Sequence, residues 1–418
     1  MNMNLLFEKI ISRRHEFPSL KEEINGYPLA YFDGPGGTQV PQSVIDAVSN
    51  YYYTSNANFH GNFITSRRTD EVLDGTREKI ATFLGADGFE NISYGHNMTS
   101  LNFSLSRAFG SYLNPGDEVL ITQLDHEANR GPWLALRENG IVVREVRVFP
   151  DGRLDYDDFE SKLNEKTRLV AMGYSSNVTG TINNVPLVRE MTYKVGALLL
   201  IDAVHYAPHF PLDVKALGVD FLLCSAYKFY GPHIGILYSN GENLNRLPTY
   251  NLRTQLQHAP FSIETGTLNH AAIAGVNAAI DYIESFGEGD TARTRIVDAM
   301  GKINLYEDAI ARDIYLKLSK IDDLTILGSV GKEEKKAPTI SFDIKGINPA
   351  DVCRYLDEQG ICAWNGHFYG IRPMEIFGYL EKGGVTRVGV SVYNTTEEVD
   401  RLVDAIKTIT KGKPIDAR

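Results

Sequence analysis

The chain contains 418 residues, of which 43% are hydrophobic and 23% are charged. This is the composition of a globular protein, and the length allows two or three domains that each bury a core. The formal net charge of −11 and the lack of any basic run argue against a surface that binds nucleic acid, and no apolar stretch has the length of a membrane span.

The N-terminal part of the chain is predicted to be mainly helical. Residues 1–27 predict a helix and a linker, without the long apolar core of a signal peptide. Residues 31–37, Tyr-Phe-Asp-Gly-Pro-Gly-Gly, predict a turn at which the backbone can approach a ligand. Further helices are expected at 41–53 and 70–83.

From about residue 90 to residue 240, short apolar strands alternate with helical stretches. The strands are expected at 118–122, 168–172, 197–201, 221–224 and 235–238. Continuous Val, Ile and Leu strands of this length are usually buried on both faces. Their alternation with helices predicts a mostly parallel sheet with helices on both sides.

The C-terminal part has a different pattern. Residues 271–320 are predicted to be long and helical. The rest of the chain has the order β, β, α, β, α, with strands expected at 324–327, 339–342 and 386–390 and helices at 350–359 and 396–410. This order is typical of a compact α+β domain.

The three cysteines, Cys224, Cys353 and Cys362, have neither metal-type pair spacing nor the even number of a disulfide framework. They fit a reducing compartment. With no signal-peptide pattern, they predict a cytoplasmic protein, and no metal site is expected.

Polar residues follow the predicted strands at the point where each strand ends. They are Asp125, His126, Glu127 and Asn129, then Ser175, Ser176 and Asn177, then Asp202 and His205, and finally Ser225, Tyr227 and Lys228. Ligands of such sheets bind at the carboxyl ends of the strands. The sequence therefore predicts a ligand site at this edge.

Lys228 directly follows a predicted buried strand, and Gly-Pro and a second apolar strand come after it. An ammonium near a core is costly, so this lysine is either paired with an acid or used chemically. Desolvation lowers the pKa of a lysine, and a neutral amine can form a Schiff base with an aldehyde. Pyridoxal phosphate (PLP) is the common biological aldehyde that binds lysine in this way.

Six segments carry a family resemblance, at residues 31–34, 124–133, 176–180, 201–205, 225–232 and 386–394. Together they resemble the class V aminotransferase and cysteine desulfurase superfamily of fold-type I PLP enzymes, over about residues 29 to 410. The group that they resemble most is the cysteine-desulfurase-like proteins.

The resemblance implies the α/β fold of a fold-type I PLP-dependent transferase. Residues 31–285 would form a large PLP-binding domain around a mostly parallel seven-stranded sheet, and residues 286–418 a smaller α+β domain. Residues 1–30 would form an N-terminal helix and linker packed with the small domain. A homodimer with shared active sites and a small amino-acid substrate are also implied.

The resemblance assigns the catalytic centre to three residues. Lys228 would hold PLP covalently and then move protons at the substrate Cα. Asp202 would pair with the pyridinium nitrogen, so that the ring accepts the carbanion electrons. His126 would stack on the pyridine ring. From the residues alone, Asp202 could instead cap the next helix, and His126 could be a polar loop residue.

The remaining cofactor contacts are implied in the same way. Asn177 would face the phenolic oxygen of PLP, although the composition around Asn177 is also typical of a turn. His205 would point toward that oxygen or toward the ring. The phosphate would take backbone amides at a helix N-terminus and hydroxyl groups. These contacts are assigned to Asn97, Met98, Thr99, Ser225 and Tyr227, with Thr267 lent to the phosphate of the neighbouring subunit.

Arg387 would bind the substrate α-carboxylate through a bidentate fork, unless it forms a surface ion pair. The substrate-binding set is completed by Trp364, His367 and Tyr369.

The chain departs from the cysteine desulfurases in the segment 360–370. Tyr369 or a close neighbour stands where those enzymes carry the cysteine that accepts sulfur, and Cys362 lies upstream in a predicted strand. Trp364 replaces a second substrate-contacting arginine. Tyrosine cannot accept sulfane sulfur, but it can serve as an acid or base. The aromatic side chains here would either line a pocket for a bulky or flat substituent or pack the domain interface.

These features predict a PLP-dependent C–S lyase that works by β-elimination and lacks the persulfide cysteine. Tyr369, His126 or His367 would protonate the leaving group, and a cysteine S-conjugate or sulfoxide would be the substrate. The alternatives are a class V aminotransferase or epimerase, a cysteine desulfurase that uses Cys362 or a small-molecule sulfur acceptor, and a non-catalytic sulfur-trafficking partner that retains PLP.

Overall fold

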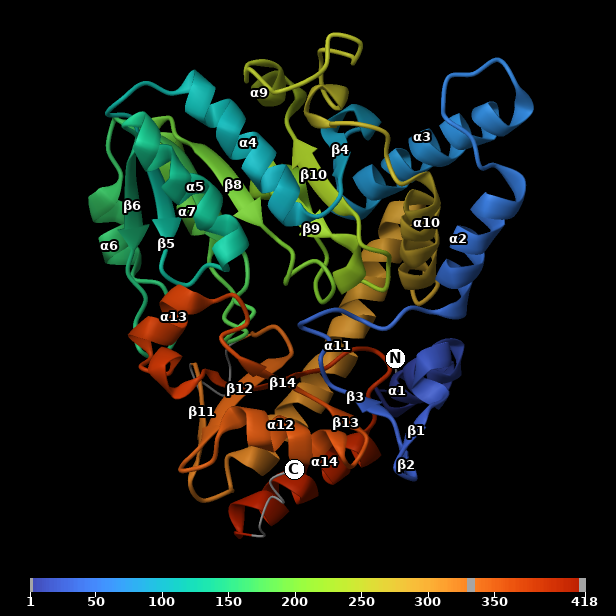
Figure 1. The fold of residues 1–418 in the computed structure, drawn as a ribbon, viewed down its shortest axis with the longest axis vertical. Helices are drawn as coiled ribbons and strands as arrows, with labels where there is room; N and C mark the ends of the chain where they lie inside the picture. The colour runs from blue at the N-terminus through green and yellow to red at the C-terminus, as the bar shows by residue number, and fades with distance from the viewer. Residues whose placement is uncertain (1–2, 329–334, 413–418) are drawn as a thin grey trace.

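The computed structural model describes residues 3–328 and 335–412. Its centre is a seven-stranded sheet with the order β4-β10-β9-β8-β7-β5-β6 (Figure 1). The strands are β4 (Ile92–Gly95), β5 (Glu118–Thr122), β6 (Val142–Val146), β7 (Thr167–Gly173), β8 (Leu198–Asp202), β9 (Phe221–Ser225) and β10 (Gly235–Ser239). Strands β9 to β6 run parallel, whereas β10 is antiparallel to both of its neighbours. The predicted fold class is confirmed.

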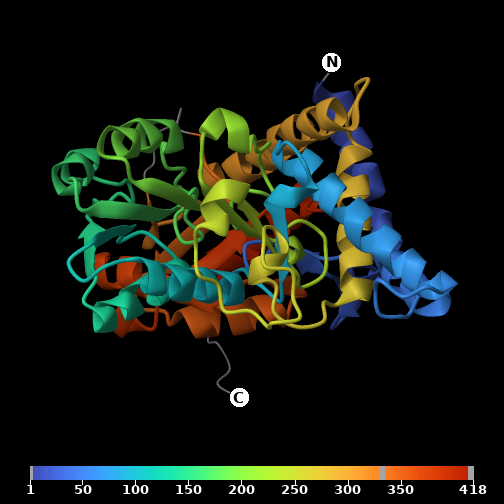
Figure 2. The ribbon, with the colours of Figure 1, turned by 90° about the horizontal axis from the view of Figure 1, so that it is seen from above.

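Both faces of this sheet are buried, because successive side chains of one strand enter different cores. Val119 and Ile121 pack in the cluster beneath helix α4 (Met98–Tyr112), whereas Leu120 packs in the opposite cluster with helix α7 (Val185–Val195). Short helices α5 (Gly131–Leu134), α6 (Tyr156–Lys162), α8 (Val214–Leu217) and α9 (Gly241–Asn245) surround the sheet (Figure 2).

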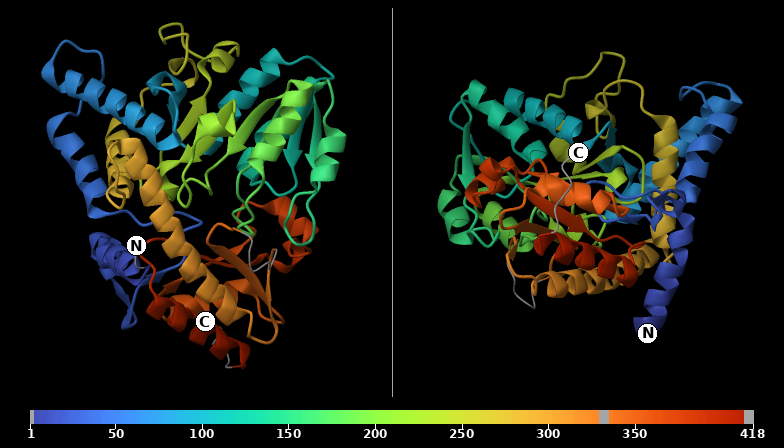
Figure 3. Two further views of the ribbon diagram at one scale, coloured as in Figure 1. Left: turned by 180° about the vertical axis from the view of Figure 1, so that it is seen from behind. Right: turned by 60° about the horizontal axis from the view of Figure 1, so that its bottom comes forward.

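A second helical layer lies beyond the β4 edge of the sheet. It consists of α2 (Gln42–Thr54), α3 (Ile64–Leu84) and α10 (His270–Glu284). The helical region predicted at 271–320 is in fact two helices, because α10 ends at Glu284 and the 27-residue α11 (Ala292–Leu318) begins after a Gly-rich connection. Helix α11 runs from this layer to the C-terminal part of the chain (Figure 3).

The C-terminal part contains a four-stranded antiparallel sheet with the order β11-β12-β15-β14. The strands are β11 (Leu324–Ile326), β12 (Thr339–Ile344), β14 (Trp364–Gly366) and β15 (Val385–Gly389), with helices α12 (Pro349–Asp357), α13 (Ile371–Ile376) and α14 (Thr396–Thr410). Strand β15 lies between β12 and β14, so Arg387 is paired with Ser341 on one side and with Trp364 on the other.

The N-terminal segment packs against this C-terminal part. Strand β3 (Ala30–Tyr31) pairs in parallel with β13 (Ile361–Cys362), and Arg14, which follows helix α1 (Met3–Ile11), donates to Glu398 of α14 at 2.7 Å. The division into domains at residues 30 and 285 stays a prediction. In the described ranges, no helix combines the length and the apolar character that a membrane crossing requires.

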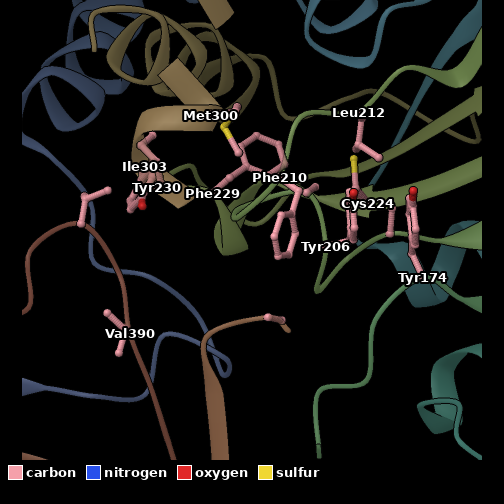
Figure 4. Close-up of a cluster of buried hydrophobic side chains, with 14 of the residues drawn as sticks. Tyr174, Tyr206, Phe210, Leu212, Cys224, Phe229, Tyr230, Met300, Ile303 and Val390 are labelled. Atoms are coloured by element: carbon pink, nitrogen blue, oxygen red, sulfur yellow. The ribbon is translucent and has the colours of Figure 1, made fainter. Parts of the chain in front are cut away.

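The largest core joins the main sheet to α11. In it the rings of Tyr174 and Tyr206 stack 3.6 Å apart, and Cys224, Phe229 and Met300 belong to the same buried cluster (Figure 4). Cys224 is therefore a packing residue of β9, enclosed by aromatic and aliphatic side chains.

Candidate active site

A cavity lies at the carboxyl ends of the parallel strands, where the sequence predicts a ligand. Every predicted cofactor-binding residue except Thr267 lines it, namely Asn97, Met98, Thr99, His126, Asn177, Asp202, His205, Ser225, Tyr227 and Lys228. The topology explains this convergence, because β5, β7, β8 and β9 end at one edge and each is followed by a polar segment.

Lys228 ends a short 3-10 turn after β9 and is buried, with its Nζ donating to the carbonyl of Pro35. Burial lowers the pKa of Lys228 to about 7, and the positive charge of Arg387 adds to this shift. The negative charges of Asp33 and Asp202 act in the opposite direction and raise the pKa of Lys228. About half of the Lys228 side chains are therefore neutral amines at neutral pH, which is the nucleophilic form.

Asp202 is the last residue of β8, and its Oδ1 accepts from the backbone of Val204 at 3.0 Å. Burial raises the pKa of Asp202 to about 6, although the backbone hydrogen bond and the charge of Lys228 work in the opposite direction. Asp202 therefore faces the cavity as a carboxylate at neutral pH, and its burial gives it a strong preference for a cationic partner.

His126 begins the turn after β5, where its Nδ1 accepts from the backbone of Ala128 at 3.0 Å. This contact places the ring proton on Nε2 of the neutral imidazole. Burial lowers the pKa of His126 to about 3, and the charge of Lys228 contributes. His126 is therefore a flat uncharged ring at neutral pH.

The residues that are predicted to bind the phosphate meet at the start of α4. Asn97 caps this 15-residue helix by accepting from Ser100, and the backbone amide of Met98 donates to Ser225 Oγ at 3.1 Å. A Cβ on Gly235 would lie only 2.3 Å from the carbonyl carbon of Asn97, so glycine is required where β10 passes this helix start. Helix N-termini with a nearby hydroxyl bind phosphate groups well.

These residues fit PLP. The cavity brings together a partly neutral amine, a buried carboxylate, a neutral imidazole and a helix N-terminus, which match the aldehyde, ring nitrogen, ring face and phosphate of that cofactor.

Two predicted contacts to the phenolic oxygen are already engaged within the protein. Asn177 Nδ2 donates to the carbonyl of Phe368 at 2.8 Å, which uses one of its two amide hydrogens. His205 Nε2 lies 2.9 Å from Thr339 Oγ1, and its buried Nδ1 has no hydrogen-bond partner. His205 therefore retains one ring nitrogen for a ligand, and Asn177 retains one hydrogen.

A second cavity opens beside the first and shares Lys228, His126 and Asn177 with it. Three of the predicted substrate-binding residues, Arg387, Trp364 and Tyr369, line this outer cavity. Their role in binding substrate stays a prediction. The walls of this cavity also include Tyr227 and His233, whose rings stack at 4.7 Å. His367 lines neither cavity; its Nδ1 accepts instead from the backbone of Tyr369 at 3.1 Å.

Arg387 is buried and forms an ion pair with Asp33, with Nη2 at 2.9 Å from Oδ1. The alternative of a surface ion pair is therefore wrong. Asp33 was not among the predicted site residues, although it belongs to the Tyr-Phe-Asp-Gly segment. Burial raises the pKa of the Asp33 carboxyl, while the adjacent Arg387 lowers it.

Asp125, which the sequence placed at this edge without assigning it a role, supports the edge of the cavity. Its two carboxylate oxygens accept from the backbone amides of Gly173, at 2.6 Å, and Thr122, at 3.0 Å. It thereby ties the end of β5 to that of β7, and burial raises its pKa to about 7. Its place after a strand was the only signal in the sequence.

The turn that carries Tyr369 has an unusual backbone. Phe368 and Tyr369 both have positive φ values, 54° and 57°. For side chains other than glycine this conformation costs about 1–2 kcal/mol per residue. Hydrogen bonds from Asn177 to Phe368 O and from the Glu127 amide to Tyr369 O, both 2.8 Å, hold the turn.

None of the three cysteines lines either cavity. Cys224 is in the main core, Cys353 is in α12, and Cys362 pairs with β3 in the small parallel sheet. Burial raises the pKa of Cys362 to about 11 and that of Cys353 to about 12. Among the described residues, no thiol lines the site.

Thr267 is exposed and lies on the loop between Glu264 and α10. Glu264 anchors this loop through a buried bidentate ion pair with Arg77, with both N···O distances between 2.7 and 2.8 Å. The role of Thr267 in a neighbouring subunit stays a prediction.

Together, the fold and the cavity define a fold-type I PLP-dependent enzyme. The Aminotransferase class-V family pattern matches residues 30–402, and the chain belongs to this family. The chain is 33% identical over 412 residues to a cysteine desulfurase of Pectobacterium atrosepticum, covering 95% of this chain and 97% of that protein. It is 34% identical over 418 residues to a probable cysteine desulfurase of Streptomyces coelicolor, with coverages of 95% and 96%.

Solved structures are similar as well. The apo cysteine desulfurase of Thermococcus onnurineus NA1 superposes with a TM-score of 0.84 at 27% identity, covering 95% of this chain and 99% of that one. The Escherichia coli cysteine desulfurase CsdA gives a TM-score of 0.83 at 25% identity, with coverages of 96% and 98%. The predicted family, PLP dependence and enzyme class are confirmed.

Proposed function

We propose that this enzyme is a C–S lyase that acts on an S-substituted cysteine by β-elimination and needs no acceptor cysteine. The observation that carries the proposal is the content of the outer cavity, where Tyr369 faces His126 at a ring distance of 5.5 Å and no described cysteine contributes. The similarity to cysteine desulfurases supports amino-acid C–S chemistry, and the lack of a site thiol favours release of a small sulfur product.

When it is bound, PLP supplies an electron sink for a negative charge at the substrate Cα. The partly neutral Lys228 amine is suited to hold the cofactor and then to take the Cα proton. Asp202 would favour positive charge at the ring nitrogen, and the neutral ring of His126 would lie against the cofactor. Arg387 binds the α-carboxylate.

Loss of the β-substituent requires a proton donor. Three candidates follow from the sequence, and the geometry favours one of them. His126 is almost fully neutral, because its pKa is lowered to about 3. His367 lines neither cavity, whereas Tyr369 lines the outer cavity. Tyr369 is therefore assigned the role of the acid that protonates the leaving thiolate.

The outer cavity also suggests the kind of substituent. Trp364 and Tyr369 are 53% and 66% exposed, so their aromatic surfaces are open to a ligand. Flat or bulky apolar groups on sulfur would pack against them. A cysteine S-conjugate is thus the proposed substrate class.

The test uses purified holoenzyme with S-methyl-, S-benzyl- and S-phenyl-cysteine. Cleavage of the C–S bond releases a thiol and an enamine, which hydrolyses to pyruvate and ammonia. Equal amounts of thiol and pyruvate are expected, with S-aryl and S-benzyl substrates preferred. Exchange of amino groups with added keto acids, without thiol release, would contradict the lyase assignment and favour an aminotransferase. Cys362→Ala should retain full thiol release. A desulfurase that uses Cys362 would instead convert L-cysteine to alanine, with the sulfur held as a persulfide on Cys362, and would lose this activity in the variant.

We also infer a cytoplasmic homodimer in which Thr267 serves the site of the other subunit. Thr267 is exposed and is not among the residues that line either cavity of its own chain, which supports this arrangement. Mixed dimers of Lys228→Ala and Thr267→Ala chains test it. The only intact lysine would then meet an intact Thr267 from the partner, so activity above that of either parent is expected.

A further inference from the structure

We propose that Phe368 is a positioning residue that fixes the Arg387 guanidinium as the receptor for the substrate α-carboxylate. The proposal rests on the carboxylate-binding role given to Arg387 under the proposed function. Phe368 belongs to the segment in which the chain departs from the cysteine desulfurases. Its side chain is buried, and the residue forms part of the wall of the outer cavity beside Arg387.

Three contacts join Phe368, Asn177 and Arg387 in a closed circuit. The Cζ atom of Arg387 lies 4.3 Å from the centre of the Phe368 ring. Arg387 Nη1 donates to the carbonyl of Asn177 at 3.2 Å, and Asn177 Nδ2 donates to the carbonyl of Phe368 at 2.8 Å. Each member is therefore held by the other two, although they come from three separate parts of the chain.

The ion pair with Asp33 completes the support. Nη2 of Arg387 donates to Asp33, and Nη1 donates to the carbonyl of Asn177. The Phe368 ring covers one face of the guanidinium. The buried Nε of Arg387 has no hydrogen-bond partner. A guanidinium that is fixed in its plane by two partners and on one face by a ring loses little freedom when a carboxylate binds.

The position of Phe368 is itself maintained against a backbone preference. Its φ of 54° is unfavourable for a bulky side chain, yet the ring lies in a buried cluster with Val178, Met374 and Val385. The neighbouring Tyr369 carbonyl is held by the amide of Glu127 at 2.8 Å. The packing of this cluster and the hydrogen bonds of the turn therefore position the Phe368 ring beneath Arg387.

The experiment compares two ligands of the holoenzyme, L-alanine and ethylamine. L-Alanine has an α-carboxylate but no leaving group at Cβ, and ethylamine is the same molecule without the carboxylate. Dissociation constants come from the change in cofactor absorption and from the ligand-dependent shift in melting temperature. In Phe368→Leu we expect L-alanine to bind about tenfold more weakly, as loss of a desolvated cation–π contact implies. Ethylamine binding should change by less than about twofold.

Phe368→Tyr keeps the ring and serves as the matched control, so its L-alanine binding should stay within about twofold of the original. Phe368→Met replaces the leucine variant if that protein does not fold. The proposal is overturned if L-alanine binding is unchanged, or if both ligands weaken equally. Because neither ligand can undergo β-elimination, this result does not depend on whether the enzyme is a lyase.

Discussion

The pKa of Lys228 gives the most direct quantitative test of the site. Burial and the nearby Arg387 lower it from 10.5 to about 7. At pH 7 about half of the Lys228 amines would then be neutral, compared with roughly 1 in 3,000 for a lysine of ordinary pKa. Since only the neutral amine attacks an aldehyde, Lys228 should react about a thousandfold faster at pH 7 than a free lysine amine of equal access.

The assay measures covalent labelling of the Lys228 peptide. Cofactor-free protein is exposed briefly to PLP between pH 5.5 and 10, reduced with borohydride and analysed by mass spectrometry. The rate should rise about tenfold per pH unit and level off above pH 7. Nα-acetyl-lysine, treated in parallel, should continue to rise towards pH 10.

A variant tests the cause of the shift. Arg387→Gln removes the second-largest contribution, so the midpoint for Lys228 should move to higher pH. A labelling rate for the original protein that keeps rising through pH 9 would refute the reasoning, because it would mean that Lys228 is not desolvated.

Three further predictions concern single side chains. Asp202→Asn should retain PLP, seen by absorption after gel filtration, but lower kcat about a hundredfold or more, because the ring loses its charge partner; full activity would exclude that role. Tyr369→Phe should lower kcat about a hundredfold for poor leaving groups and much less for p-nitrophenyl thiolate, which leaves without a proton, and equal losses would argue against the acid role. Arg77→Met should reduce the free energy of unfolding by about 3–5 kcal/mol in urea titrations, because Glu264 would be left as an unpaired buried charge. As a control, Arg246→Ala removes an exposed ion pair and should reduce the free energy of unfolding by less than about 1 kcal/mol.

The central sheet was largely predictable from the sequence, because burial on both faces produces uninterrupted apolar runs. The five predicted strands lie within one or two residues of β5, β7, β8, β9 and β10. The two sheet-edge strands gave no such run. Strand β6 has alternating buried and exposed residues, and β4 has only four residues, including a serine. In β6, Val142 and Arg144 are exposed, whereas β4 is buried but too short to produce an apolar run.

The cofactor cavity was predictable for a topological reason. Polar residues placed after consecutive parallel strands must meet at one edge, whatever the details of packing. The contacts of Arg387 on the substrate side were harder to predict from the sequence. Asp33, which binds Arg387, is 354 residues away in the chain, and Phe368 contacts Arg387 from a left-handed turn. Neither contact has a local pattern in the sequence, and a phenylalanine with positive φ cannot be anticipated from its propensity.

The turn at Tyr369 bears on the fate of the sulfur atom. A cysteine that accepts sulfur must move away from the cofactor with its cargo, which favours a loop with few fixed contacts. Here two successive residues, Phe368 and Tyr369, have a left-handed backbone conformation, which costs about 1–2 kcal/mol per residue. Hydrogen bonds from Asn177 and Glu127, in two other segments, stabilise the turn. Such a turn favours a side chain that acts without a change of position. The contacts that keep Phe368 beneath Arg387 would therefore also keep Tyr369 beside His126. A phenol in that position can donate a proton to sulfur but cannot bind and transfer sulfur. The product should therefore leave as a free thiol.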